Sequence, residues 1–357
     1  MANAGAGATT GTDMVWADVL GPLVARADLS VDAAERAMST ILAGDATDAQ
    51  IAGFAVALRA KGETSEELAA LARTMVEFAE RVDLDDTQPL IDTCGTGGDR
   101  SGSVNVSTMA AMIAAGAGAK VAKHGNRAAS SRCGSADVLE ALGVVIDLGP
   151  EGVARCVREA GIGFCFAPRF HPALRFAAGP RRELGIPTTF NFLGPLANPA
   201  RVRRQAVGVS DPTMAERMVH ALDRLGIERA LVFHGHDGLD ELTTTGPSTV
   251  YDLDDGSVRT YDVDPSSLGL PAAAPADLLG GDATGNAVVV RAVLAGEPGP
   301  ARDIAALNAA AALVVGGLAA DLPEGLERAF AAIDDGRAAD VLESFVHASA
   351  AAREDGN

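Results

Sequence analysis

Residues 92–108, DTCGTGGDRSGSVNVST, constrain the fold more than any other segment of this chain. A strand-like run at 90–93 enters a glycine-rich loop, and a helical pattern opens near Ser107. Glycine tolerates positive φ and lets backbone N–H groups approach an anion closely. The helix N-terminus adds aligned N–H groups and a partial positive charge. The spacing is neither a dinucleotide fingerprint nor a Walker loop. The segment predicts an anion-binding strand–loop–helix unit; a plain strand–helix turn is the alternative.

Short apolar runs alternate with helix-like stretches from about residue 89 onward. Strands are expected at 90–93, 120–123, 144–146, 163–167, 205–209 and 230–233, and helices at 107–116 and 136–142. Two further runs, 251–253 and 258–263, flank Asp-Asp-Gly and predict a hairpin. The chain from Ala301 is Ala-rich and helical. This alternation predicts an α/β domain built around a central, largely parallel sheet.

The first 85 residues instead carry helical periodicity. Thr47 with Gln50 and Thr64 with Glu67 each fit a capping box, and apolar residues recur at helical spacing between them. We therefore expect a disordered tail at 1–12, a small helical domain at 13–85 and an α/β domain at 86–350. The segment 181–200, RRELGIPTTFNFLGPLANPA, breaks the strand–helix rhythm and is expected to complete the helical domain.

Charge excludes some partners. The net charge of −19 would repel a phosphate backbone, so no nucleic-acid partner is expected. No apolar run is long enough to cross a membrane. The four cysteines lack metal-site spacing, which indicates thiols in a reducing cytoplasm.

Arginines crowd the middle of the chain and suggest a local anion site, with ordinary surface ion pairing as the alternative. These are Arg169, Arg175, Arg181, Arg182, Arg201, Arg203 and Arg204.

Two further polar segments follow expected strands. Residues 123–135, KHGNRAASSRCGS, offer cationic and hydroxyl groups that suit a pyrophosphate, although a polar turn would look similar. Residues 234–243, HGHDGLDELT, place Asp240 beside Glu241. Adjacent acids on a loop are usually solvated. In a protein with a pyrophosphate loop they predict a Mg²⁺ site, because Mg²⁺ prefers hard oxygens and bridges carboxylates to substrate phosphates.

Six motifs together resemble the anthranilate phosphoribosyltransferases: GTGGD at 95–99, NVST at 105–108, KHGNR at 123–127, SAD at 135–137, FNFLGPLANP at 190–199 and DGLDE at 237–241. They occur in the family's order and spacing, and the resemblance extends from about residue 14 to 350. It implies a nucleoside phosphorylase/phosphoribosyltransferase-like fold, with a small helical domain and a larger α/β domain. It also implies a cytoplasmic homodimer that uses Mg²⁺, phosphoribosyl pyrophosphate and anthranilate in tryptophan biosynthesis.

The resemblance also implies site residues. Those for phosphoribosyl pyrophosphate are Gly95, Gly98, Asp99, Ser103, Asn105, Val106, Ser107, Thr108, Lys123, His124, Gly125, Asn126, Arg127, Ala128, Ala129, Ser130, Ser131 and Ser135. Those for anthranilate are Gly95, Asn126 and Arg181, with Arg181 on the carboxylate. Those for Mg²⁺ are Ser107, Asp240 and Glu241. Pro187 and Cys133 depart from the family's usual residues, which affects only details of their loops.

Chemistry leaves some roles open. His124 is the candidate acceptor for the amine's proton, and a structural role in its turn is the alternative. A pyrimidine nucleoside phosphorylase would share the architecture, but it needs no paired acids for Mg²⁺. A non-catalytic, nucleic-acid-binding relative is opposed by the negative charge and by the complete set of site residues. The acid pair and the segment 190–199 favour the transferase.

Overall fold

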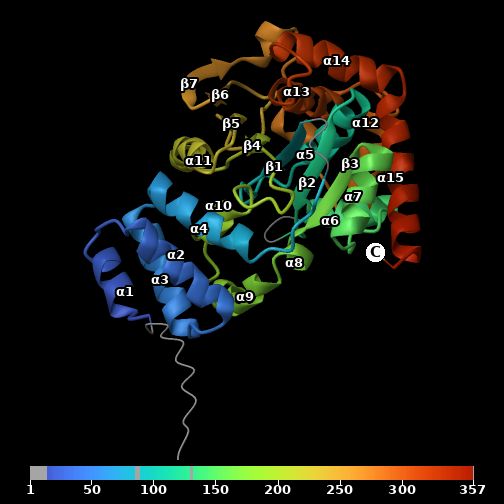
Figure 1. Cartoon of the computed structure of the whole chain (residues 1–357). Coiled ribbons are helices and arrows are strands. Elements are labelled where there is room, and N and C mark those ends of the chain that lie inside the picture. The colour runs from blue at the N-terminus through green and yellow to red at the C-terminus, as the bar shows by residue number, and fades with distance from the viewer. Residues whose placement is uncertain (1–13, 85–88, 129–131, 357) are drawn as a thin grey trace, which may run out of the picture.

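The computed structural model describes residues 14–84, 89–128 and 132–356. The tail expected at 1–12 lies outside them. The bundle at the N-terminal end, blue in Figure 1, consists of α1 (Ala17–Val24), α2 (Val31–Ala43), α3 (Asp48–Lys61) and α4 (Ser65–Glu77). Both expected capping boxes are present: Thr47 and Gln50 begin α3, and Thr64 and Glu67 begin α4. Each box satisfies two backbone N–H groups that a helix start would otherwise leave unpaired.

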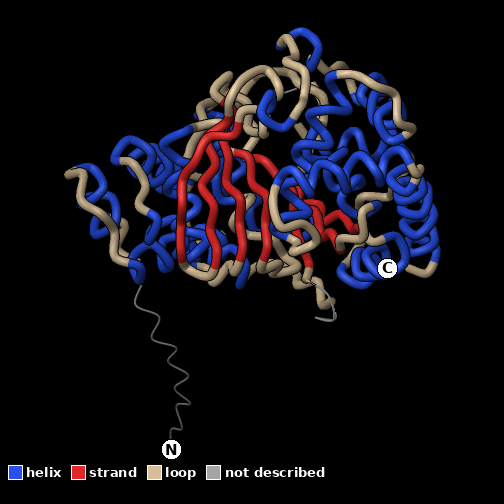
Figure 2. Tube along the Cα trace, turned by 90° about the horizontal axis from the view of Figure 1, so that it is seen from above, coloured by secondary structure: helices blue, strands red, loops and turns tan. Residues whose placement is uncertain are grey.

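One seven-stranded sheet forms the centre of the larger part (Figure 2). Its strands are β1 (Leu90–Gly95), β2 (Lys120–Gly125), β3 (Ile162–Phe166), β4 (Arg204–Gly208), β5 (Arg229–Gly235), β6 (Ser248–Asp254) and β7 (Ser257–Val263). The spatial order is β3-β2-β1-β4-β5-β6-β7. The first five strands in that order run parallel, and β6 and β7 form the antiparallel hairpin. The expected fold class is confirmed.

The helices after α4 pack on the two faces of this sheet or, as α9 and α10 do, against the bundle. They are α5 (Val106–Gly116), α6 (Ser135–Leu142), α7 (Pro150–Ala160), α8 (Ala167–Phe170), α9 (Arg175–Leu184), α10 (Phe190–Leu193), α11 (Pro212–Arg224), α12 (Ala283–Leu294), α13 (Pro300–Val315), α14 (Leu322–Asp334) and α15 (Arg337–Glu354). Short 3₁₀ turns lie at Pro172–Leu174, Pro265–Leu268 and Pro275–Leu278. Because successive strand side chains alternate in direction, Ala206 and Val207 of β4 join different cores.

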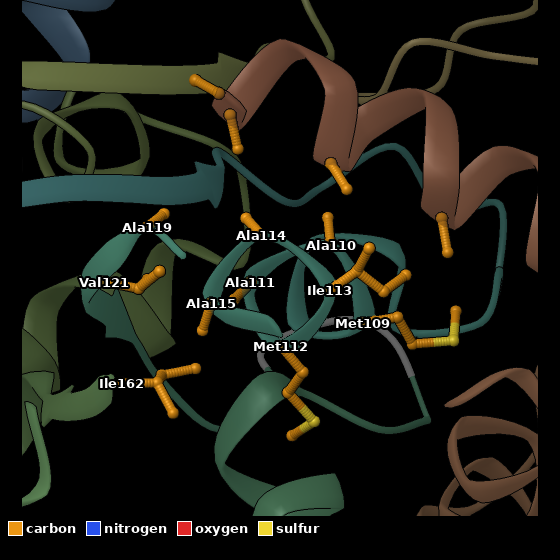
Figure 3. Close-up of a cluster of buried hydrophobic side chains, with 14 of the residues drawn as sticks. Met109, Ala110, Ala111, Met112, Ile113, Ala114, Ala115, Ala119, Val121 and Ile162 are labelled. Carbon is orange, nitrogen blue, oxygen red and sulfur yellow. The ribbon is translucent and has the colours of Figure 1, made fainter. Parts of the chain in front are cut away.

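The two cores divide the molecule. One surrounds α5, whose small side chains let α13 and β1 approach it closely (Figure 3). The other joins the N-terminal bundle to α11 and to the opposite sheet face. The chain returns to the bundle after β3, since α9 contacts α2 and α3, and α10 contacts α4. The bundle therefore packs against elements that precede and follow β4, which brings α4 and α10 close to the strand ends.

The prediction of a strand at 144–146 is wrong. This segment forms no strand and no ladder. Val144, Ile146 and Leu148 are buried, while the Val145 N–H donates to the Ser349 hydroxyl on α15. An extended segment packed between helices produces the same alternation of apolar residues as a strand, so the pattern could not separate the two.

The remaining global features concern helices and thiols. Within the described ranges, no helix has the length and apolar character that crossing a membrane requires. All four cysteines lie in those ranges as buried thiols rather than disulfides.

Candidate active site

A cleft of about 320 Å³ opens at the carboxyl ends of β1 and β2 and is bounded by α4, α9 and α10 on the other side. Ligands of open α/β sheets typically bind beyond the carboxyl ends of the strands. The lining includes Gly95, Gly97, Gly98, Asn105, Ser107, Thr108, Lys123, His124, Gly125, Asn126, Arg127, Ala128, Ser135, Arg181, Asp240 and Glu241. The structure thus brings the three polar segments singled out in the sequence to one place.

The glycine loop has the backbone that an anion site needs. Gly97, Gly98 and Gly102 adopt positive φ values of 65°, 83° and 65°. Helix α5 begins immediately afterwards, with Asn105 at its N-cap position. The Asn105 amide instead donates to the Cys133 carbonyl and accepts from Asn286, so it braces the loop. A glycine-rich loop followed by a helix N-terminus is the combination that oxyanion sites use, and Gly95, Gly98 and Ser107 of this segment line the cleft.

The two acids reach the cleft beneath this loop. Burial, together with the neighbouring Asp99 carboxylate, raises the pKa of Asp240 to about 6. Burial raises the pKa of Glu241 well above its usual value, and Asp240 adds to that shift. Two adjacent buried carboxylates repel one another, and a bound cation would relieve that repulsion. The donor set therefore fits a hard divalent ion.

The same acids do not form a complete metal site alone. No group of three or more His, Cys, Asp or Glu side chains among the described residues is arranged to hold a metal ion. Mg²⁺ commonly takes one or two carboxylates and completes its shell with water and substrate phosphates. The arrangement suits an ion that shares its ligands with a bound pyrophosphate.

Close backbone contacts fix the position of Asp240. A Cβ atom on Gly208 would lie 1.6 Å from the Asp240 carbonyl oxygen, and one on Gly95 would lie 2.2 Å from Asp240 Oδ2. Only glycine leaves room at these two strand ends. Gly208 was not predicted as a site residue. Its position at the end of an expected strand is the sequence feature that could have identified it.

Lys123 is the cation next to the acids. Its Nζ donates to the Thr93 carbonyl and lies 3.2 Å from the Ser107 hydroxyl. Burial lowers the pKa of Lys123, while the negative charge of Asp92 opposes that shift. The ammonium group therefore lies between the strand ends and the start of α5, beside the expected metal ligand Ser107.

The polar side chains of the loop at 123–135 already contact other protein groups. Arg127 pairs with Asp137 at 2.9 Å and with Glu140, both on α6. The Asn126 side chain accepts from the Arg127 N–H, and the Ser135 hydroxyl donates to the Asn126 carbonyl. Ala129, Ser130 and Ser131 lie outside the described residues. A phosphate at this loop would have to compete with α6 for Arg127.

Arg181 stands at the opposite wall of the cleft, on α9. Its guanidinium lies 5.5 Å from the centre of the Phe190 ring. It forms no ion pair or hydrogen bond with any residue that the structure describes, and burial lowers its pKa. An unpaired, partly buried guanidinium is costly unless a ligand anion completes it. This end of the cleft therefore suits a carboxylate.

His124 is held by contacts with two other segments. Its Nδ1 lies 3.0 Å from the Gly194 carbonyl, and its ring is 5.1 Å from that of His171. Burial, with His171 adding, lowers the pKa of His124 to about 3. Because Nδ1 must donate to a carbonyl, Nε2 carries the lone pair, and Nε2 has no partner among the described residues. The imidazole is neutral.

Some predicted residues do not line the cleft. Asp99 accepts hydrogen bonds from Ser101, Ser103 bridges to Leu279, and Val106 is buried in the core. The middle arginines do not converge either, since Arg169 pairs with Glu80, and Arg203 and Arg204 pair with Glu228. Of the seven, Arg181 alone lines the cleft, so surface ion pairing was the better interpretation for those three.

A buried network behind the cleft was missed. Asp92 accepts from the His124 N–H at 3.1 Å and from the Asn198 amide at 2.8 Å. Asn198 also donates to the Ala122 carbonyl. It thereby ties the segment at 190–199 to β1 and β2. Asp92 interrupts an apolar strand and was the one signal of this network in the sequence.

Comparisons with known proteins agree with this geometry. Residues 17–79 match the helical bundle domain of a glycosyl transferase family, and residues 87–339 match the family's α/β domain. An anthranilate phosphoribosyltransferase from Arthrobacter sp. (strain FB24) is 56% identical over 337 residues, which cover 93% of this chain and 95% of that protein.

Solved structures show the same likeness. The anthranilate phosphoribosyltransferase of Thermus thermophilus superposes with a TM-score of 0.88 at 42% identity, covering 93% of this chain and 99% of that one. The Saccharomyces cerevisiae enzyme in complex with phosphoribosyl pyrophosphate and Mg superposes with a TM-score of 0.86 at 27% identity, covering 94% and 98%.

Proposed function

This chain belongs to the anthranilate phosphoribosyltransferase family, and we propose that its cleft joins anthranilate to phosphoribosyl pyrophosphate in tryptophan biosynthesis. One observation carries the assignment of its two ends. The glycine loop and the buried acids meet at the strand ends, while Arg181 lies unpaired on the opposite wall. A pyrophosphate suits the first end and an aromatic carboxylate suits the second. The acid pair and the named relatives favour this transfer over a nucleoside phosphorylase reaction.

The reaction breaks the bond between C1 of the ribose and the pyrophosphate oxygen, and the electron pair leaves with the pyrophosphate. Positive charge develops on the sugar ring, as in an oxocarbenium-like transition state. The amine nitrogen of anthranilate then donates its lone pair to C1 and loses one proton. The amine is already neutral at pH 7, so much of the rate comes from holding the two substrates in line.

At the leaving-group end, loop N–H groups and the start of α5 stabilise the growing negative charge. The Lys123 amine lies next to Ser107, where its protonated form adds positive charge. Ser107, Asp240 and Glu241 would hold Mg²⁺, which neutralises charge on the leaving pyrophosphate when bound. The remaining predicted loop residues at 95–108 and 123–135 would complete this end.

At the acceptor end, Arg181 would bind the anthranilate carboxylate with its planar fork. Phe190 provides an apolar surface beside that guanidinium. Gly95 and Asn126 line the same cleft and are the other predicted contacts. This arrangement turns the amine toward the ribose.

The role of His124 as proton acceptor stays a prediction. A base works best when its pKa is close to the operating pH, so a pKa of about 3 is unfavourable to that role. The hydrogen bond to Gly194 supports the alternative, in which His124 holds the segment that carries Phe190.

Assembly as a homodimer through the bundle is part of the proposal. Val15, Val24, Val31 and Val56 are exposed apolar residues of this bundle, which supports contact with a second copy. The four buried thiols support a reducing cytoplasm.

A fluorescence assay tests the proposed activity. The change in anthranilate fluorescence should require the enzyme, anthranilate, phosphoribosyl pyrophosphate and Mg²⁺ together. Omitting any one of them should abolish it. Signal loss that occurs equally without phosphoribosyl pyrophosphate would overturn the assignment, and phosphate-dependent cleavage of a pyrimidine nucleoside would replace it with the phosphorylase.

A further inference from the structure

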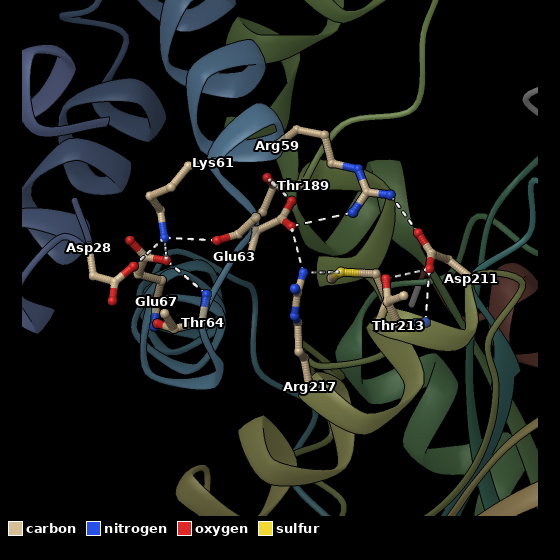
Figure 4. Close-up of polar contacts among 12 residues, drawn as sticks. Asp28, Arg59, Lys61, Glu63, Thr64, Glu67, Thr189, Asp211, Thr213 and Arg217 are labelled. Atoms are coloured by element: carbon tan, nitrogen blue, oxygen red, sulfur yellow. Dashed lines mark hydrogen bonds and ion pairs between the residues drawn. The ribbon is translucent and has the colours of Figure 1, made fainter. Parts of the chain in front are cut away.

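Arg59, near the end of α3, contacts two carboxylates: Glu63, four residues further along the chain, and Asp211, which is 152 residues away (Figure 4). Its Nη1 lies 3.3 Å from Glu63 Oε2, and its Nη2 lies 2.5 Å from Asp211 Oδ2. The guanidinium also lies over the Phe192 ring at 5.0 Å. The Glu63 side chain is wholly buried, so this ion pair has defined geometry and little screening by solvent.

One branch of this network leads to the acceptor end of the cleft. The Thr189 hydroxyl donates to Glu63 Oε1 at 2.5 Å. Thr189 directly precedes Phe190, the residue whose ring lies beside Arg181. A shift of the Glu63 carboxylate would therefore move the first turn of α10 and the apolar wall next to the proposed carboxylate site.

The other branch leads to the pyrophosphate end. Asp211 caps α11, and Ser210 directly precedes it. The Ser210 hydroxyl donates to the Gly97 carbonyl at 2.9 Å, and the Ser210 N–H donates to the Thr96 hydroxyl at 3.2 Å. Ser210 thus holds the glycine loop from behind.

We propose that Arg59, Glu63 and Asp211 are positioning residues that couple the two ends of the cleft, an inference that rests on the proposed function. None of them lines the cleft. They act through Ser210 on the glycine loop and through Thr189 on Phe190. When pyrophosphate binds, it fixes the glycine loop and, through Ser210, the ion pairs of Arg59 with Asp211 and Glu63. Glu63 in turn fixes Thr189 and the Phe190 ring beside Arg181, so anthranilate binds more tightly. Coupling between two binding sites is reciprocal, and pyrophosphate should gain the same factor from anthranilate.

Calorimetry with pyrophosphate and anthranilate tests this without turnover. Magnesium pyrophosphate is titrated into the full-length protein with and without saturating anthranilate, since no ribosyl donor is then present. We expect anthranilate to tighten pyrophosphate binding by about five-fold or more in the wild type. Asp211→Asn keeps a side-chain oxygen for the Thr213 N–H but removes the charge that Arg59 contacts, and should reduce this factor to below about two-fold.

Two further variants keep the test decisive. Ser210→Ala removes the contact to Gly97 without touching an ion pair, and should also abolish the coupling. Thr213→Ala is the matched control, because it removes a 2.7 Å hydrogen bond to the same Asp211 carboxylate but lies outside both branches. It should keep the wild-type factor. Asp211→Asn failing to fold would leave Ser210→Ala as the deciding variant.

The outcomes separate this inference from the proposed function. A wild type that turns over both substrates but shows no coupling overturns the inference alone. The same holds if Ser210→Ala and a folded Asp211→Asn keep the wild-type factor, or if Thr213→Ala loses it equally. A wild type that binds neither probe and makes no product overturns the proposed function as well.

Discussion

The Gly97 N–H donates a 2.7 Å hydrogen bond to Oδ2 of Asp240, which joins the glycine loop directly to the acid pair. These residues are far apart in the sequence and meet because β1, β4 and β5 are neighbours in the sheet. The bond occupies one oxygen of Asp240. It also engages the Gly97 amide, so this N–H is already occupied when a phosphate binds.

Gly95→Ala should disturb the metal site. The added Cβ would lie 2.2 Å from Asp240 Oδ2, so the carboxylate has to move. We expect the Mg²⁺ concentration for half-maximal activity to rise by roughly ten-fold, about the effect of losing one charged contact. Activity measured over a Mg²⁺ series checks this. Gly246→Ala is the control, because its Cβ would meet nothing within 4 Å; an equal effect there would contradict the explanation.

Mg²⁺ should stabilise the protein more at pH 7.5 than at pH 5. The folded-state pKa of Asp240 is raised from 3.8 to about 6, and that of Glu241 is raised well above its usual value. A raised pKa means that stability is present below the unfolded value and is lost as pH rises through the folded value. Ionised Asp240 thus destabilises the metal-free protein at pH 7.5, ionisation of Glu241 would add to that cost, and bound Mg²⁺ would offset it.

The measurement is the increase in Tm on adding millimolar Mg²⁺ at each pH. His124 and His171, whose folded pKa values are lowered to about 3 and about 4, change Tm with pH in the opposite direction. Their contribution is the same with and without Mg²⁺, so it cancels in the increase in Tm. Asp240→Asn with Glu241→Gln should abolish the pH dependence and sharply reduce turnover in a folded protein. A Mg²⁺ effect in this double variant equal to that of the wild type would remove the metal assignment.

His124→Gln should lower kcat by less than roughly ten-fold. Glutamine can still donate to the Gly194 carbonyl, so the positioning contact survives while the basic nitrogen is lost. General-base catalysis typically contributes 10²–10⁴-fold, and a loss in that range would instead establish His124 as the proton acceptor. Steady-state kinetics at saturating substrates, compared with His124→Ala, distinguish the two roles.

The sequence predicted most local structure, but it did not predict contacts between residues that are far apart in the chain. The strand–loop–helix unit at 92–108 follows from glycines and helix-start residues that lie next to one another. The Arg59–Asp211 pair spans 152 residues and exists only because α3 and the end of β4 meet in the fold. Asp240 was identified by its chemistry, but the glycines that make room for it, especially Gly208, become visible only when the strands are side by side.

Arg181 and Arg182 provide the sharpest test of substrate identity, because neighbouring arginines on α9 have different surroundings. Arg181 lines the cleft without a polar partner in the described structure, whereas Arg182 is exposed. A bidentate charged contact in a partly desolvated site contributes roughly 1.5–3 kcal/mol. Arg181→Ala should therefore raise the KM for anthranilate by roughly ten- to a hundred-fold, with a much smaller change for phosphoribosyl pyrophosphate.

Stability provides an independent readout for the same variant. Removing an unpaired, half-buried charge relieves its desolvation cost, so the Tm of ligand-free Arg181→Ala should stay level or rise. Arg181→Lys keeps the charge but loses the planar fork and should give an intermediate KM. Arg182→Ala should leave both KM values within about two-fold, as expected for an exposed side chain. A larger anthranilate effect from Arg182→Ala, or equal effects of Arg181→Ala on both substrates, would show that α9 does not bind the carboxylate in this way.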